Sequence, residues 1–163
     1  MLSYTMFAEL MKRLDRWVEA ANEAASAEGM LTIRPCTIRL LGQTALIEAG
    51  VELTLIATKD VDVYADFDWG VRKELERLLA SRGLVLDPLG EEVWMPRETE
   101  YVLAHEGRWI TGHIAEPDFV LISKALKASE KNRPLIIELL AKGPSERFLA
   151  LAERYELDLE QFL

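Results

Sequence analysis

The sequence has little cysteine, because Cys36 is the only one among 163 residues. A lone cysteine cannot form a disulfide within the chain, which favours a reducing compartment. The chain also lacks a hydrophobic run long enough to span a bilayer, and its N-terminus lacks the basic and apolar segments of a signal peptide. We therefore expect a cytoplasmic protein with no membrane partner.

Positive charge is also scarce, since 19 Lys and Arg stand against 28 Asp and Glu, for a net charge of −9 and a pI near 4.8. This balance disfavours broad nucleic-acid binding, although a local basic patch can still contact RNA. The only histidines, His105 and His113, form no Cys/His cluster that would hold zinc. The length fits a single domain over residues 1–163.

Hydrophobic periodicity predicts a long amphipathic helix over residues 3–28, a sheet core over residues 37–115 and a helical tail over residues 117–163. The predicted strands cover residues 37–41, 58–65, 84–86, 92–95, 100–105 and 109–115. Helices are expected over residues 43–49 and 68–83. Pro134 and Pro144 divide the tail into three helices. The predicted fold class is α+β with an α/β core, a mixed sheet flanked by helices.

Two acidic residues, Asp60 and Asp62, stand two apart on a predicted strand. Their side chains therefore point to the same face, while Val61 and Val63 point into the core. Two carboxylates this close repel each other unless a cation lies between them, and Mg²⁺ prefers one or two carboxylates plus substrate phosphates. A solvated acidic surface is the alternative interpretation.

Two further features could hold phosphate groups. Gly42 lies between a predicted strand and the first turn of a helix, where free backbone N–H groups attract anions. Lys124, Lys127 and Lys131 are spaced by three and four residues, as on one helix face. The alternatives are a tight turn at Gly42 and a solvated face of lysines.

The order of these elements resembles the nucleotidyltransferase superfamily, and most closely its minimal bacterial AbiEii-like and MNT-like members. Those proteins, found in toxin–antitoxin and phage-defence systems, carry Gly-Gly/Ser-x-Ala, a helix and then Thr-x-Asp-Ile/Val-Asp. Similar stretches here are LGQTAL at residues 41–46 and TKDVDV at residues 58–63. Residues 117–126 are similar to their Pro-x-x-x-Leu-x-x-Lys helix, and the likeness covers residues 37–140 in ordered pieces.

The resemblance implies a magnesium-dependent enzyme that moves a nucleotidyl group from an NTP to a protein or RNA hydroxyl. Asp60 and Asp62 would hold the Mg²⁺. The residues that would contact the nucleotide are Gly42, Gln43, Thr44, Thr58 and Lys124. The family uses a third carboxylate, but the strand over residues 109–115 offers only Thr111 and His113, so Glu100 is the best substitute.

One departure and this missing acid leave an alternative open. Gln43 stands where the family has a second Gly or a Ser, so a bulky side chain occupies the position at which the backbone would approach phosphates. The alternative is a catalytically degenerate module that binds nucleotide or a cognate toxin or antitoxin protein. A homodimer through the aliphatic stripe over residues 135–140 is also open, as is an unrelated α+β scaffold.

Overall fold

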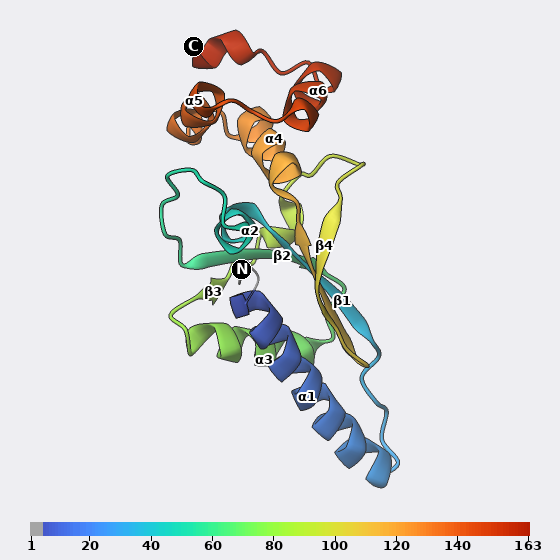
Figure 1. Ribbon diagram of the computed structural model, residues 1–163. Helices are drawn as coiled ribbons and strands as arrows, with labels where there is room; N and C mark the ends of the chain where they lie inside the picture. The colour runs from blue at the N-terminus through green and yellow to red at the C-terminus, as the bar shows by residue number, and fades with distance from the viewer. Residues whose placement is uncertain (1–4) are drawn as a thin grey trace.

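The computed structural model describes residues 5–163, in which six α-helices flank a sheet of five strands (Figure 1). The strands are β1 (Cys36–Leu41), β2 (Asp60–Ala65), β3 (Val85–Leu86), β4 (Tyr101–Glu106) and β5 (Ile110–Ala115). The helices are α1 (Thr5–Ala27), α2 (Gly42–Ala49), α3 (Trp69–Ala80), α4 (Pro117–Lys127), α5 (Arg133–Lys142) and α6 (Glu146–Arg154). This mixed sheet with its helices confirms the predicted α+β class.

The strand order β3-β2-β1-β5-β4 places β1 at the centre of the sheet. Strand β1 is antiparallel to β2 and parallel to β5, which in turn is antiparallel to β4. The short strand β3 runs parallel to β2 at the sheet edge. The antiparallel register pairs Leu41, the last residue of β1, with Asp62. The predicted helix at the C-terminal end of β1 therefore begins beside the predicted acidic pair.

Helix α1 covers one face of the sheet together with α3, because its hydrophobic side chains recur on one stripe. Its fully buried members are Phe7, Leu10, Met11, Leu14 and Val18. The helix and the sheet approach closely at Gly112, where an added Cβ would lie 2.5 Å from Met11 Cγ. Polar contacts also hold the helix, since Asp15 Oδ1 accepts from the backbone N–H groups of Trp109 and Ile110 at 2.8 and 2.9 Å.

Most predicted elements are confirmed within about two residues, and one is wrong. The segment 92–95 is not a strand: β3 pairs with β2 rather than with this segment, and the chain instead makes a 3₁₀ turn, η1 (Gly90–Glu92), against β2. An added Cβ on Gly90 would lie 3.0 Å from the backbone nitrogen of Val63, so this turn rests directly on the strand. The predicted helix start at Ser3 lies outside the described residues.

The tail forms three helices at one end of the molecule, as predicted, and a final 3₁₀ turn, η2 (Leu159–Phe162) (Figure 1). Arg147 ties α6 to the start of α4, because its guanidinium pairs with Glu116 and Asp118 directly after β5. In the aliphatic stripe, Leu135 and Ile136 are buried while Leu139 and Leu140 are half-buried. The stripe therefore contributes to the core.

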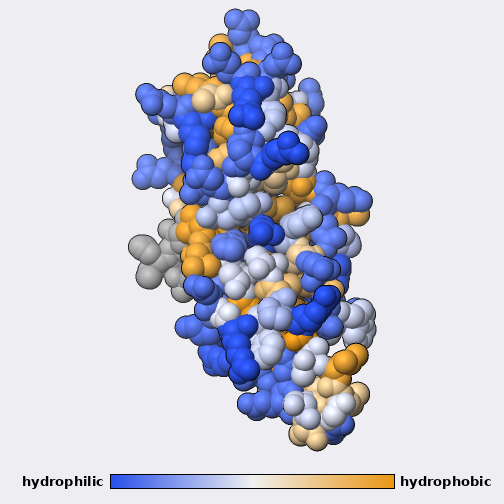
Figure 2. Space-filling view, turned by 90° about the vertical axis from the view of Figure 1, so that its right-hand side faces the viewer, coloured by the Kyte–Doolittle hydropathy of each residue, from blue (hydrophilic) through white to orange (hydrophobic). Residues whose placement is uncertain are grey.

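No helix among the described residues is long and apolar enough to cross a membrane. The face shown in Figure 2 carries mainly hydrophilic side chains, with hydrophobic ones in smaller groups between them.

Candidate functional site

Gly42 and Asp62 meet where β1 passes into α2. The register brings Asp62 beside Leu41, and Gly42 then turns the chain into the helix with a φ of +65°. A Cβ at position 42 would lie 2.5 Å from Asp62 Oδ2, so the absence of a side chain there makes room for the carboxylate. Within residues 5–163 no side chain caps the α2 N-terminus, which leaves its first N–H groups near an acidic strand.

A cavity of about 330 Å³ opens at this junction. Its walls come from four parts of the chain: the start of α2, β2, the segment 92–95 and the C-terminal half of α4 with the turn that follows. Gly42, Asp62, Lys124, Lys127 and Lys131 all line it. The structure therefore brings together the glycine, one aspartate of the pair and the three lysines that the sequence singled out. A cavity of this size falls in the range of small-ligand sites.

Asp62 is the most perturbed acidic group at this site. Its pKa is raised to about 6, first by burial and then by the nearby carboxyl of Asp87 through a hydrogen bond and like charge. Lys124 acts in the opposite direction. Asp62 Oδ1 is one of only two fully buried side-chain polar atoms that lack a hydrogen-bond partner in the described part of the chain. A buried carboxylate oxygen without a donor is a candidate ligand for a cation.

Asp87 is the acidic neighbour that the sequence did not indicate. Parallel pairing of β3 with β2 places it beside Asp62, and its backbone N–H donates to the carbonyl of Val61 at 2.9 Å. Its Oδ1 also accepts from the N–H of Leu89 at 2.9 Å, which orders the following turn. In the sequence, Asp87-Pro88 is typical of a turn, and nothing local reveals that the two residues before it form a strand that pairs with β2.

The three lysines line the cavity, although only two of them belong to α4. That helix ends at Lys127, so Lys131 lies in the following turn and not on the predicted helix face. Asn132 holds this turn, since its Nδ2 donates to the carbonyls of Lys124 and Ala128 at 3.4 and 3.0 Å. Burial and the charge of Lys131 lower the pKa of Lys124, while Asp62 raises it. Anion binding would relieve the repulsion between the two lysines.

Trp94 also lines the cavity. Its ring lies under Lys127, with the Nζ atom 5.1 Å from the ring centroid, and it meets Tyr155 edge to face at 5.5 Å. Ser123 on α4 donates to the carbonyl of Trp94 and so fixes the segment 92–95 against the helix. The aromatic wall is therefore held in place by contacts with both α4 and the chain that follows α6.

Four predicted site residues lie near the cavity without lining it. Asp60 is exposed at the start of β2, on the same face as Asp62, as predicted. Its backbone carbonyl accepts from the hydroxyl of buried Thr44 at 3.4 Å, and the Thr58 hydroxyl accepts from its N–H at 3.1 Å. Gln43 turns to the loop before β2 and donates to the carbonyl of Ile56 at 3.1 Å. The side chains of Gln43, Thr44 and Thr58 therefore hold the backbone around the start of β2.

Glu100 is not brought to the acidic pair. It is exposed immediately before β4, which is separated from β2 by β1 and β5. Three strand spacings place it about 14 Å from the Asp62 position across the sheet. Its carboxylate instead lies 3.7 Å from the guanidinium of Arg147. The third carboxylate near Asp62 is therefore Asp87.

The donor set suits a cation only in combination with a ligand. Within residues 5–163 there is no group of three or more Cys, His, Asp or Glu side chains arranged to hold a metal ion. Asp62, with Asp60 and Asp87 beside it, offers oxygen donors of the type Mg²⁺ takes when phosphates complete its shell. The buried oxygen of Asp62 and the like charges around it fit such an ion.

Comparisons of this chain with protein-family models, curated proteins and solved structures give no match. The functional interpretation therefore depends on the residues of the site.

Proposed function

We propose that this protein is a magnesium-dependent nucleotidyltransferase, which moves a nucleotidyl group from an NTP to a protein or RNA hydroxyl. The single observation that carries the proposal is the meeting of Gly42, Asp62 and three lysines around one cavity. A carboxylate with an unpartnered buried oxygen and three cationic side chains line a cavity of about 330 Å³, within the range of small-ligand sites. The resemblance of residues 37–140 to toxin–antitoxin nucleotidyltransferases agrees with this arrangement.

Each part of the site has a role in such a reaction. Asp62, with Asp60, would hold Mg²⁺, which supplies charge neutralisation and orientation of the phosphates. Gly42 and the N-terminal amides of α2 would approach the phosphates, because no Cβ stands in the way. Lys124, Lys127 and Lys131 would bind the β and γ phosphates and then the departing pyrophosphate.

The reaction is a substitution at the α phosphorus of the NTP. The acceptor hydroxyl oxygen attacks the α phosphorus, a new P–O bond forms, and the bond to the β-phosphate oxygen breaks to release pyrophosphate. The hydroxyl proton passes to the carboxylate of Asp87, which lies next to Asp62. Asp87 takes the place in this scheme that the sequence interpretation gave to Glu100.

The test is a calorimetric titration of each of the four NTPs, with and without Mg²⁺, into the wild type and Asp62→Asn. We expect magnesium-dependent binding of at least one NTP, which the substitution abolishes. Asp118→Asn is the matched control, because this aspartate pairs with Arg147 and does not line the cavity. Equal binding by the wild type and Asp62→Asn would overturn the assignment of the site.

The second candidate is a degenerate module that binds nucleotide, or a cognate toxin or antitoxin protein, without transfer. The specific observation in its favour is the side chain of Gln43, which donates a hydrogen bond to the carbonyl of Ile56 in the loop before β2. Gln43 is thus engaged with protein and is not placed to bind phosphate. Nucleotide binding without any pyrophosphate release in the presence of candidate RNA and protein acceptors would favour this module. Lack of binding to all four NTPs would turn the search to protein partners.

A further inference from the structure

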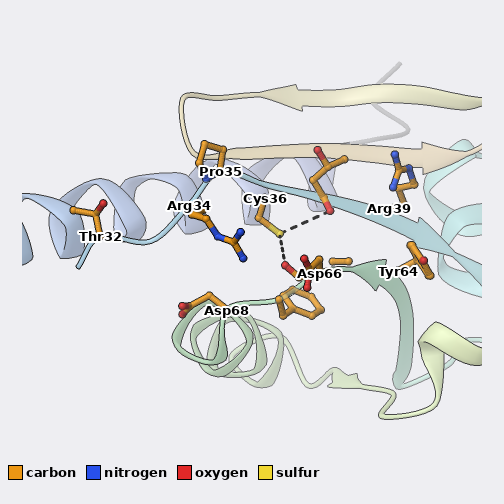
Figure 3. A pocket seen from close by; sticks show the side chains of 11 residues that line it. Thr32, Arg34, Pro35, Cys36, Arg39, Tyr64, Asp66 and Asp68 are labelled. Atoms are coloured by element: carbon orange, nitrogen blue, oxygen red, sulfur yellow. Dashed lines mark hydrogen bonds between the residues drawn. The ribbon is translucent and has the colours of Figure 1, made fainter. Parts of the chain in front are cut away.

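The cavity at Asp62 continues into a groove over the sheet. It shares Val93 and Met95 with a neighbouring cavity of about 480 Å³. That cavity in turn shares Arg39 and Tyr64 with a third of about 560 Å³, shown in Figure 3. We call these three adjoining cavities the sheet groove. It follows β1 from Asp62 back toward Pro35, and a six-residue strand spans about 20 Å.

The floor of the sheet groove presents aromatic rings beside arginine. Arg39 on β1 lies in register with Tyr64 on β2 and with His113 on β5. Its guanidinium carbon is 5.5 Å from the ring centroid of Tyr101 on β4. Tyr64 is 53% exposed although it lies on an inner strand. Flat rings held on a sheet beside arginine are suited to stacking with nucleobases.

Charge distinguishes this groove from the rest of the molecule. Its walls carry six of the 19 basic side chains of the chain but only five of the 28 acidic ones. Arg97 and Arg39 stand at its middle, and the lysines at its Asp62 end. The groove is thus slightly basic in a protein of net charge −9, and a polyanion would be directed to it.

A peptide strand fits this surface less well. Extended peptides bind sheets by adding to an unpaired edge. The strand under the groove, β1, is hydrogen-bonded on both edges, to β2 and to β5. What the floor offers is side-chain surface, not backbone donors and acceptors.

We propose that the sheet groove binds a short single-stranded RNA end, whose bases stack on Tyr64 and Tyr101 and whose terminal hydroxyl reaches Asp62. This rests on the proposed nucleotidyltransferase function and names RNA as its acceptor. Arg39 and Arg97 pair with the RNA phosphates along the groove. The local charge explains how an acidic protein binds RNA over a few nucleotides without wrapping around a longer strand.

The experiment measures the fluorescence anisotropy of a 5′-labelled, mixed-sequence 12-nucleotide RNA without NTP or Mg²⁺. We expect Tyr64→Ala to weaken binding on the order of tenfold, as for loss of one stacked base. Tyr64→Phe keeps the ring and should bind as the wild type does. Trp69→Ala is the matched control, because Trp69 is an exposed aromatic beside Lys73 on α3 and outside the groove.

Two further readouts separate this proposal from the function on which it rests. Tyr64→Ala should bind NTP and Mg²⁺ as the wild type does, which also establishes that it is folded. RNA binding that depends on Tyr64 in a protein that binds no NTP would uphold the groove and overturn the transferase. NTP binding without RNA binding would overturn the groove and leave a protein hydroxyl as the acceptor. Equal binding of a blunt RNA duplex would also overturn it, since paired bases cannot stack on the floor.

Discussion

Gly42 and Asp62 occupy one space: the carboxylate of Asp62 lies where a side chain at position 42 would be. An added Cβ would approach Asp62 Oδ2 to 2.5 Å, and the backbone at Gly42 has a φ of +65°. Each of these alone favours glycine at this position. Together they explain why the strand-glycine-helix pattern and the aspartate, 20 residues apart in the sequence, form one site.

The first prediction separates the two constraints on Gly42. Gly42→Ala should lower the free energy of unfolding by about 2–4 kcal/mol, because it combines a strained φ with displacement of the Asp62 carboxylate. Gly29→Ala is the matched control: its φ is +69°, but among the described residues nothing lies within 4 Å of an added Cβ. Urea unfolding should show the control losing only about 1–2 kcal/mol. Equal losses in the two variants would mean that the Asp62 carboxylate moves away from the added Cβ without any loss of stability.

The second prediction concerns the pH dependence of stability. Asp62 has a pKa of about 6 in the fold against 3.8 for the free side chain. Between these values the folded protein binds the proton that the unfolded chain has lost, so stability falls as pH rises from about 4 to 6. Asp62→Asn should remove that slope and raise the free energy of unfolding at pH 7 by about 1 kcal/mol. Asp60→Asn, on the exposed neighbour, should leave the slope in place.

Thermal unfolding of the three proteins at pH 4, 5, 6 and 7 measures this difference. A lower melting temperature of Asp62→Asn at pH 7 would show that the carboxylate is stabilised by its neighbours, contrary to the cause we assign. Mg²⁺ and NTP should raise the melting temperature of the wild type and leave that of Asp62→Asn unchanged, because the ligands bind only the folded form.

Local patterns were sufficient to predict one half of the site. The alternation of Asp60 to Val63 and the glycine after a short strand specify β2 and the start of α2 within a few residues. Asp87 could not be predicted in the same way. Its position depends on a parallel pairing of only two residues, whose register comes from packing of α3 and not from its own sequence. The segment 92–95 was wrongly predicted to be a strand, because its own sequence does not show that β3 pairs with β2 instead of with it.

Glu100 illustrates the opposite error. It was chosen because it lies on the predicted strand that precedes residues 109–115, where no acid stands, but strand order in the sequence does not give strand order in the sheet. In the sheet, β1 and β5 separate β4 from β2, so an acid at the start of β4 faces Arg147 instead. Aspartates two apart on one strand are fixed relative to each other by backbone geometry, whereas acids on different strands are not.

The third prediction distinguishes the two candidates for the third carboxylate. Asp87→Asn should abolish transfer and weaken NTP binding with Mg²⁺, since it removes the negative charge next to Asp62. The amide oxygen still accepts from the Leu89 N–H, so the turn should persist. Glu100→Gln should change NTP affinity less than twofold, because this carboxylate contacts Arg147 near β4, at the opposite edge of the sheet from β3. Calorimetry with both variants tests this, and a greater loss with Glu100→Gln would reverse the assignment.

The fourth prediction concerns the lysine that faces Asp62. Lys124→Gln should weaken binding of NTP with Mg²⁺ about tenfold, the contribution of one charge-assisted hydrogen bond to phosphate. It should also raise the pKa of Asp62, because the Lys124 charge holds that pKa down. Lys12→Gln, on the exposed side of α1, changes the net charge equally and serves as the control. If both variants lose affinity alike, the effect is one of total charge and the cavity is not the site.

The last prediction concerns the support of the sheet on which the groove lies. Asp15 Oδ1 accepts from two consecutive N–H groups, of Trp109 and Ile110, at the start of β5. Asp15→Ala leaves both donors without their partner and should cost roughly 2–4 kcal/mol of unfolding free energy. Asp15→Asn retains an oxygen acceptor and should recover most of this loss.

The control for Asp15 is Glu9→Ala on the same helix, where the carboxylate only pairs with Arg13 on the surface at 3.1 Å. That change should cost much less than Asp15→Ala, because solvent screens this exposed pair. Urea denaturation gives all three values. If Asp15→Asn were as unstable as Asp15→Ala, the negative charge beside His105 would be the stabilising feature, since His105 Nε2 lies 3.5 Å from Asp15 Oδ2. The helix would then be held to the hairpin by an ion pair and not by backbone hydrogen bonds.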